Sequence, residues 1–159
     1  MLHVAPELFQ TRLRLLGSLS YGKWDDKDSN NLWKYAAGFD WNYHKLNVIA
    51  EYLLSRYQNI GLTGGGTEDG ERAGYYIKAL YRFTPKWRGL IEYSHASLYN
   101  TGLSFLRNDI YNTTTFGIDY FLTEASTIIG QIAVGTGKRS DGSEEMDFDR
   151  ATIGWRTTF

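Results

Sequence analysis

Two acidic stretches carry side chains of the kind that bind metal ions. In "DDKDSN", Asp26, Asp28 and Asn30 occupy alternate positions, which is the spacing of the first oxygen ligands in a calcium-binding loop. Such a loop needs a glycine at its sixth position, and Asn31 stands there instead. The stretch "DGSEEMDFD" at 141–149 is similarly acidic. Solvated loops explain both stretches, with calcium binding as the alternative.

The histidines and the glycine-rich stretch do not form recognisable sites. His3, His44 and His95 are scattered along the chain, so they indicate no metal cluster. The stretch "GLTGGGTEDGE" at 61–71 resembles a phosphate-binding loop only in its glycines, because it lacks the Gly-Lys-Ser/Thr ending and a following helix. We predict a flexible loop there, and we expect no cofactor.

The composition of the chain excludes several classes of protein. The 159 residues suit one domain, and a net charge of −1 implies no general attraction to nucleic acids. There is no cysteine, and therefore no disulfide framework or thiolate chemistry. No apolar run is long enough for a transmembrane helix. Met1 is followed almost at once by "ELFQTRLRLL", which has no signal-peptide character.

Apolar and polar residues alternate along nearly the whole chain, which is the period of β-strands. The mean hydropathy is negative, but this does not exclude a membrane barrel, because only alternate residues of its strands face lipid. The alternation predicts about eight strands of roughly ten residues or more. They lie within residues 9–23, 33–43, 46–55, 72–83, 87–97, 112–121, 126–135 and 148–159.

The predicted connections alternate between long and short. Short turns such as "HK" at 44–45 and "TPK" at 84–86 alternate with long polar stretches such as 58–71 and 98–109. Short turns at one end and long loops at the other are typical of an outer-membrane barrel. With an even number of strands, both termini are expected at the short-turn, periplasmic end.

Aromatic residues concentrate near the predicted strand ends. They form two groups, as expected for rings that prefer the two membrane interfaces. The group near the short turns comprises Trp41, Tyr43, Phe83, Trp87, Tyr120 and Phe159, and the group toward the long loops comprises Tyr21, Trp33, Tyr35, Tyr75 and Tyr93. The alternative is a soluble sandwich or lipocalin-like barrel whose apolar face points inward. Such a core gives no reason to place tryptophan and tyrosine at strand ends.

If the apolar faces contact lipid, the opposite faces line the lumen. The basic residues on those faces are Arg12, Arg14, Lys34, Lys78, Arg82, Arg88, Arg150 and Arg156, and the acidic ones are Asp40, Glu51, Glu92 and Asp119. We expect Glu51, Glu92, Arg82 and Arg88 to form a charged network near the short turns. The surplus of basic residues favours a water-filled lumen that prefers anions. The alternative is a narrow barrel plugged by paired side chains.

The alternation, the short "TPK" turn and the terminal Phe159 resemble bacterial outer-membrane proteins. In that class, the resemblance implies that Phe159, together with Trp155 on the same face, forms the signal read by the barrel-assembly machinery. It also implies an integral location in the bacterial outer membrane, in contact with the lipid bilayer and lipopolysaccharide.

A narrower resemblance lies in "GFDWNYHKLNVIAEYLLSRY" and "GYYIKALYRFTPKWRGLIEYSHAS". These stretches are similar to the C-terminal half of phosphate-selective porins over residues 33–97, with a weaker likeness over 113–159. The resemblance implies a channel for passive diffusion. We carry no anion-binding residue over, because in that family those residues lie in the other half of the chain. A porin of this family has about twice as many strands. This chain is therefore expected to be either the C-terminal part of a larger barrel or a complete eight-stranded one.

His95 and Ser97 in "YSHAS", with Asp109 after the next loop, resemble the catalytic residues of outer-membrane lipid A deacylases. The resemblance implies a histidine base and a serine nucleophile on the lipid face. That family carries its motif near the last strands, and the residues around the motif here do not match. An interfacial histidine beside a loop serine is the simpler interpretation.

We therefore predict one all-β domain over residues 1–159, an antiparallel up-and-down transmembrane β-barrel with about eight strands. The expected function is a porin-like channel for small hydrophilic solutes with a mild anion preference, without enzymatic activity. A non-conducting barrel with structural, adhesive or binding loops and a deacylase are the alternatives. The expected partners are lipid, lipopolysaccharide, the assembly machinery and small solutes or anions, but not nucleic acid. Oligomerisation stays open.

Overall fold

The computed structural model describes residues 11–23, 30–61, 67–100, 110–138 and 145–157. Over these residues the chain forms eight strands and no helix, which confirms the all-β prediction. The described part contains no helix that could cross a membrane. The strands are β1 (Thr11–Lys23), β2 (Asn31–Tyr43), β3 (Leu46–Gly61), β4 (Thr67–Arg82), β5 (Trp87–Asn100), β6 (Ile110–Phe121), β7 (Ser126–Lys138) and β8 (Glu145–Thr157).

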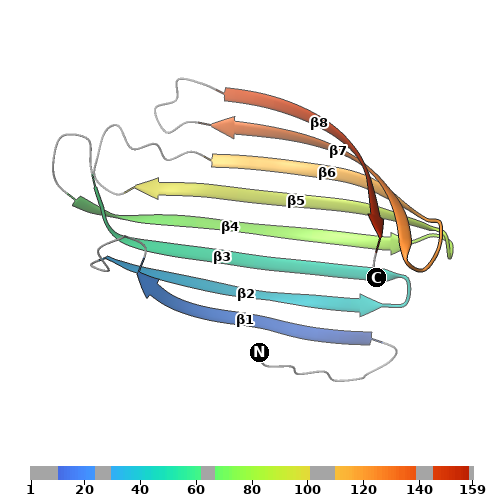
Figure 1. Cartoon of the computed structure of the whole chain (residues 1–159), viewed down its shortest axis with the longest axis horizontal. Coiled ribbons are helices and arrows are strands. Elements are labelled where there is room, and N and C mark those ends of the chain that lie inside the picture. Colours follow the sequence, from blue (N-terminus) through green and yellow to red (C-terminus); the bar gives the residue numbers. More distant parts are fainter. Residues whose placement is uncertain (1–10, 24–29, 62–66, 101–109, 139–144, 158–159) are drawn as a thin grey trace.

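The strands form one antiparallel sheet in which each strand pairs with its neighbours in the sequence. Figure 1 shows them side by side in chain order, from β1 at one edge to β8 at the other. This is the up-and-down topology that the alternation predicts, and it is consistent with a barrel. Among the described residues no pairing joins β1 to β8, so the sheet is not closed.

The short turns gather at one end of the sheet, and the longer connections leave from the other end (Figure 1). The β2–β3 turn consists of His44 and Lys45, and His44 adopts a φ of 50°. Left-handed residues are usual in two-residue hairpin turns because their twist matches that of the strands. In the β4–β5 turn, the hydroxyl of Thr84 accepts hydrogen bonds from the backbone N–H groups of Lys86 and Trp87.

Several strands continue beyond the apolar alternation that reveals them in the sequence. β3 continues to Gly61 and β4 begins at Thr67, so the stretch 58–71, predicted as a long loop, is largely hairpin. β5 likewise continues to Asn100. Backbone hydrogen bonds stabilise a hairpin even where both faces are polar, and such strands leave no alternating signal. A register shift between Tyr57 and Ile60 lies in this polar extension.

The two faces of the sheet differ in chemistry. One face, here called the apolar face, carries large side chains that are exposed on every strand, including Ile153 at 87% and Trp155 at 70%. Among the described residues the only buried apolar side chain is Ala133. A soluble sandwich or lipocalin-like barrel would bury its apolar face, so this arrangement contradicts the soluble alternative. An apolar exterior of this extent is what lipid requires.

Candidate pore lining

The opposite face, here called the polar face, carries all the residues predicted to line a pore. Strand pairing joins one row across all eight strands, because each member lies opposite the next in the adjacent strand. The row is Arg14, Asp40, Ile49, Lys78, Glu92, Thr115, Ala133 and Arg150. The same pairing places Arg12, Lys34, Glu51, Arg82, Arg88 and Arg156 on this face. The alternation in the sequence thus predicted a shared face, and the pore-lining role of these residues stays a prediction.

The middle of the polar face is hollow. A cavity of about 230 Å³ lies along it, and its walls come from β4 through β8. The cavity is lined by Lys78, Leu90, Glu92, Thr115, Gln131, Ala133, Arg150 and Thr152. Since one space is bounded by five neighbouring strands, the sheet curves around its polar face. Three charged side chains of the central row, Lys78, Glu92 and Arg150, therefore face a common space.

Two ion pairs form across neighbouring strands on this face. Lys78 Nζ lies 2.5 Å from Glu92 Oε2, and both side chains keep about a quarter of their surface exposed. Arg88 donates from Nε and Nη2 to one oxygen of Asp119. Asp119 is only 3% exposed, so its charge depends on this guanidinium.

These partners differ from the network expected among Glu51, Glu92, Arg82 and Arg88. The strand register determines which residues pair, because Lys78 lies directly opposite Glu92 and Asp119 lies directly opposite Arg88. Glu51 instead accepts a hydrogen bond from the hydroxyl of Tyr76, at 3.1 Å.

Arginine and aromatic rings gather at the short-turn end of the polar face. The guanidinium carbons of Arg82 and Arg88 lie 4.7 and 5.1 Å from the ring centroid of Phe121. A second cavity, of about 320 Å³, opens beside Arg82, Arg88, His44 and Lys45. Cation–π contacts hold an arginine in place while leaving its N–H donors available. The turn end of the face is therefore basic.

Most other cations of the polar face have no acidic partner in the described part of the chain. The carboxylate of Asp40 accepts from the side-chain amides of Asn42 and Asn47, at 2.9 and 2.5 Å, rather than from Arg14 opposite. Arg14 Nε is buried, and no described group bonds to it. Every acidic residue of this face predicted from the sequence lies on β2, β3, β5 or β6. The edge strands contribute only cations: Arg12, Arg14, Arg150 and Arg156.

The pore lining predicted from the sequence leaves out three side chains of the polar face, Tyr57, Arg72 and Tyr76. Arg72 lies over the ring of Tyr57, with its guanidinium carbon 5.3 Å from the centroid. Tyr76 contacts Glu51 through its hydroxyl, and Lys78 Nζ lies 5.7 Å from its ring centroid. Arg72 continues the even-numbered row of β4 that holds Tyr76 and Lys78. The same alternation could have placed Arg72 on the polar face. The prediction leaves it out because the apolar residues that reveal β4 begin only at Ala73.

The residues of the deacylase interpretation do not form a reactive pair. Ser97 is 4% exposed, and its hydroxyl donates to the backbone carbonyl of Ala73 at 3.3 Å. His95 stacks on Tyr75, and its Nδ1 lies 2.8 Å from Asn112 Oδ1. Asp109 lies outside the described residues. Since the serine hydroxyl is bonded to backbone rather than to the histidine, this geometry does not favour nucleophilic catalysis.

Replacing Ser97 with alanine is therefore expected to cost at most about 1 kcal/mol, the usual contribution of one neutral hydrogen bond. The acylation of lipid A in cells that express the variant should match that in cells with the unchanged chain. Mass spectrometry of extracted lipid A and denaturant unfolding test the two parts. A lipid A species that disappears with Ser97→Ala would contradict this expectation and revive the enzyme.

Other sequence candidates lie partly beyond the described residues. Asp26 and Asp28 of the calcium-type stretch and the terminal Phe159 all fall outside them. Asn31 belongs to β2. No group of three histidine, aspartate or glutamate residues in the described ranges is placed to hold a metal ion. Trp155 lies on the apolar face, where its ring is exposed.

Comparison with models of known families shows to which family the chain belongs. A family model described as phosphate-selective porin O and P matches residues 8–125. The chain belongs to this porin family. Membership implies that the porin lies in the bacterial outer membrane and acts as a channel. Comparisons with curated proteins and with solved structures found no match for the porin.

Proposed function

We propose that this porin lets small hydrophilic solutes diffuse passively across the outer membrane, with a mild preference for anions. The observation that carries the preference is the unbalanced charge of the polar face. Arg12, Arg14, Arg150 and Arg156 lie on it without an acidic partner among the described residues. The family's description as phosphate-selective agrees with this preference.

The proposed mechanism is partial replacement of water around a passing ion. Guanidinium and ammonium groups along a water-filled passage donate hydrogen bonds to an anion and offset part of its lost hydration. Acidic groups on the same face, such as Glu92 and Asp119, are already neutralised by Lys78 and Arg88. They therefore attract cations weakly, and the remaining field is positive.

Single-channel recording in a planar bilayer tests the proposal. The 159-residue chain is refolded in detergent, inserted into a phospholipid bilayer and recorded under a KCl gradient. Potassium and chloride have similar mobilities in water, so the sign of the reversal potential reports the charge selectivity of the lumen. Discrete steps with a reversal potential toward that of chloride support the proposal. A folded, membrane-inserted chain that stays silent, or one that selects potassium, overturns it.

A further inference from the structure

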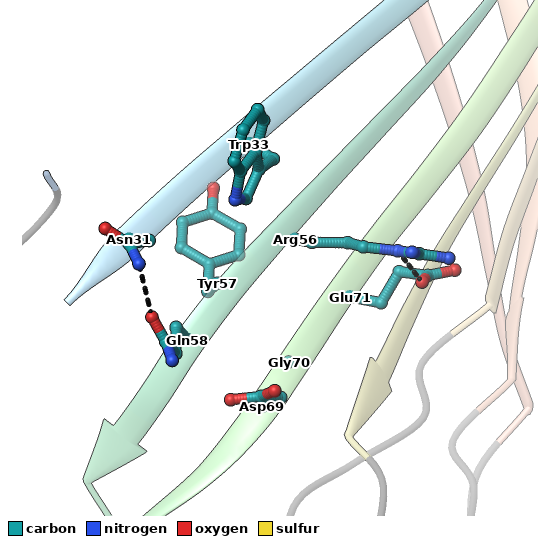
Figure 2. A pocket seen from close by; sticks show the side chains of 8 residues that line it. All are labelled: Asn31, Trp33, Arg56, Tyr57, Gln58, Asp69, Gly70 and Glu71. Carbon is teal, nitrogen blue, oxygen red and sulfur yellow. Dashed lines mark hydrogen bonds and ion pairs between the residues drawn. The ribbon is translucent and has the colours of Figure 1, made fainter. Parts of the chain in front are cut away.

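A second polar cluster lies on the apolar face, at the end where the longer connections leave the sheet. Here Lys23, Asn31, Arg56 and Glu71 occupy outward positions on four successive strands. A cavity of about 440 Å³ opens between β2, β3 and β4. Figure 2 shows the residues that line it, with Trp33 and Asn31 from β2 beside Arg56 and Gln58 from β3. The cluster is separate from the pore lining, because it lies on the other face of the sheet.

Side chains of three strands build one side of this cluster. Asn31 Oδ1 accepts from the hydroxyl of Tyr21 at 2.5 Å and from Lys23 Nζ at 2.7 Å. Its Nδ2 donates to Gln58 Oε1 at 2.7 Å (Figure 2). The Tyr21 ring packs on Trp33, with centroids 4.3 Å apart. The amides and rings are thus held in a fixed arrangement around an exposed lysine.

Arg56 forms the other side of the cluster. Its Nε donates to Glu71 Oε2 at 2.9 Å, and its side chain is 62% exposed. Neither of its Nη groups has an acceptor within the described residues. The ammonium of Lys23 likewise uses one bond, to Asn31, of the three it can donate. Lys23 and Arg56 stand two strands apart, about 10 Å across the sheet, and Arg56 is level with Tyr21, the outward residue before Lys23. Two cations therefore keep free donors at the same end of the outer surface.

The position and the charge of the cluster indicate its ligand. Trp33, Tyr21 and Tyr35 mark the level of the lipid headgroups, where aromatic rings of membrane proteins gather. With Asp69 and Glu71 nearby, the cluster has no net charge and does not attract free anions from solution. A lipid phosphate already lies at this level, so its binding costs little translational entropy. Amides and aromatic rings beside the cations also suit sugar hydroxyl groups.

We propose that this cluster, Lys23, Asn31, Arg56 and Gln58 beside Trp33, binds the phosphorylated sugar headgroup of a glycolipid in the outer leaflet. Lys23 and Arg56 donate to phosphate, and the amides and the tryptophan ring contact sugar. The site rests on the outer-membrane location of the porin and not on conduction. A chain that proves silent in bilayers therefore leaves it untouched.

Native mass spectrometry of the refolded full chain in detergent tests the site, with diphosphoryl lipid A as the probe. The unchanged chain should retain diphosphoryl lipid A in preference to phosphatidylglycerol and to lipid A from which the phosphates have been removed. The double variant Lys23→Gln, Arg56→Gln should retain it about tenfold less, because two charge-assisted contacts are lost. Each variant is first shown to fold by the shift of its gel mobility on heating.

Glu71→Gln provides a matched control. It breaks the same ion pair as Arg56→Gln but leaves the cation in place, so lipid A retention should stay within about twofold of the unchanged chain. If Glu71→Gln loses as much lipid A retention as Arg56→Gln does, the ion pair only supports the local structure, and the proposal is overturned. Equal retention of dephosphorylated lipid A or of phosphatidylglycerol, or full retention by the double variant, would overturn it too.

Discussion

Replacing Arg88 with methionine is expected to destabilise the porin by about 3 kcal/mol, the typical cost of leaving a buried charge without its partner. Asp119 is almost fully buried, and Arg88 donates two hydrogen bonds to one of its oxygens. Methionine keeps the unbranched apolar stem of the arginine side chain, so the change removes chiefly the charged guanidinium. Urea unfolding of the chain in lipid vesicles, followed by tryptophan fluorescence, measures the free energy of unfolding.

The partner variant should behave differently. Asp119→Asn leaves Arg88 about a quarter exposed and stacked over Phe121, so we expect a loss of only about 1 kcal/mol. The double variant should lose less than the sum of the two single variants, because the two residues interact directly.

Lys78→Met serves as the comparison within the chain. It breaks the Lys78–Glu92 pair on the same face, but both of these side chains reach water. The expected cost is under about 1 kcal/mol, as for other exposed pairs. If Lys78→Met lowers the free energy of unfolding as much as Arg88→Met does, burial is not what makes the Arg88–Asp119 pair important for stability.

Reversing two charges of the polar face should convert the channel from anion to cation preference. Arg14 and Arg150 stand at the two ends of the central row, and neither pairs with a described acidic residue. A unit charge close to a passing ion contributes about 1 kcal/mol even in water. In Arg14→Glu, Arg150→Glu, the ratio of anion to cation permeability should fall by about tenfold or more. The measurement is the reversal potential in a KCl gradient.

The control places the same change of charge on the other face. Lys23→Glu, Arg56→Glu alters the net charge of the chain by the same amount, but these side chains point away from the lumen. Its reversal potential should stay close to that of the unchanged chain. If both double variants shift the potential equally, the selectivity arises from charge at the membrane surface and not from the polar face.

The alternation of residue types predicted most of the fold. In a strand that contacts lipid on one face, every second residue must be apolar, so residues such as Leu19, Tyr35 and Ile77 reveal both the strand and its orientation. The same two-residue period also assigns the pore-lining candidates, from Arg12 in β1 to Arg156 in β8, to the polar face. The outer parts of β3 and β4 were not predicted, because in water neither face needs to be apolar.

The charged partners could not be predicted in the same way. Partners depend on which residues lie opposite each other, and a shift of one residue changes every pair. Alternation fixes the face of Glu92 but not its neighbour, which proves to be Lys78. The lipid-facing cluster also escaped prediction. Arg56 and Glu71 interrupt the apolar pattern, and they read in the sequence as loop residues rather than as a cross-strand pair.

The polar extension of the β3–β4 hairpin has a consequence for how the protein changes over time. Beyond Leu54 and Ala73, paired on the apolar face, the hairpin is held by its backbone and by surface contacts such as the Arg56–Glu71 pair. Substitutions in that part leave the central row of the polar face unchanged, because that row crosses β3 and β4 at Ile49 and Lys78. The short turns of outer-membrane barrels face the periplasm, so this end of the molecule is the one that antibodies and bacteriophages can reach. Apart from the proposed headgroup site, the surface at this end can therefore diversify while the central row of the polar face stays the same.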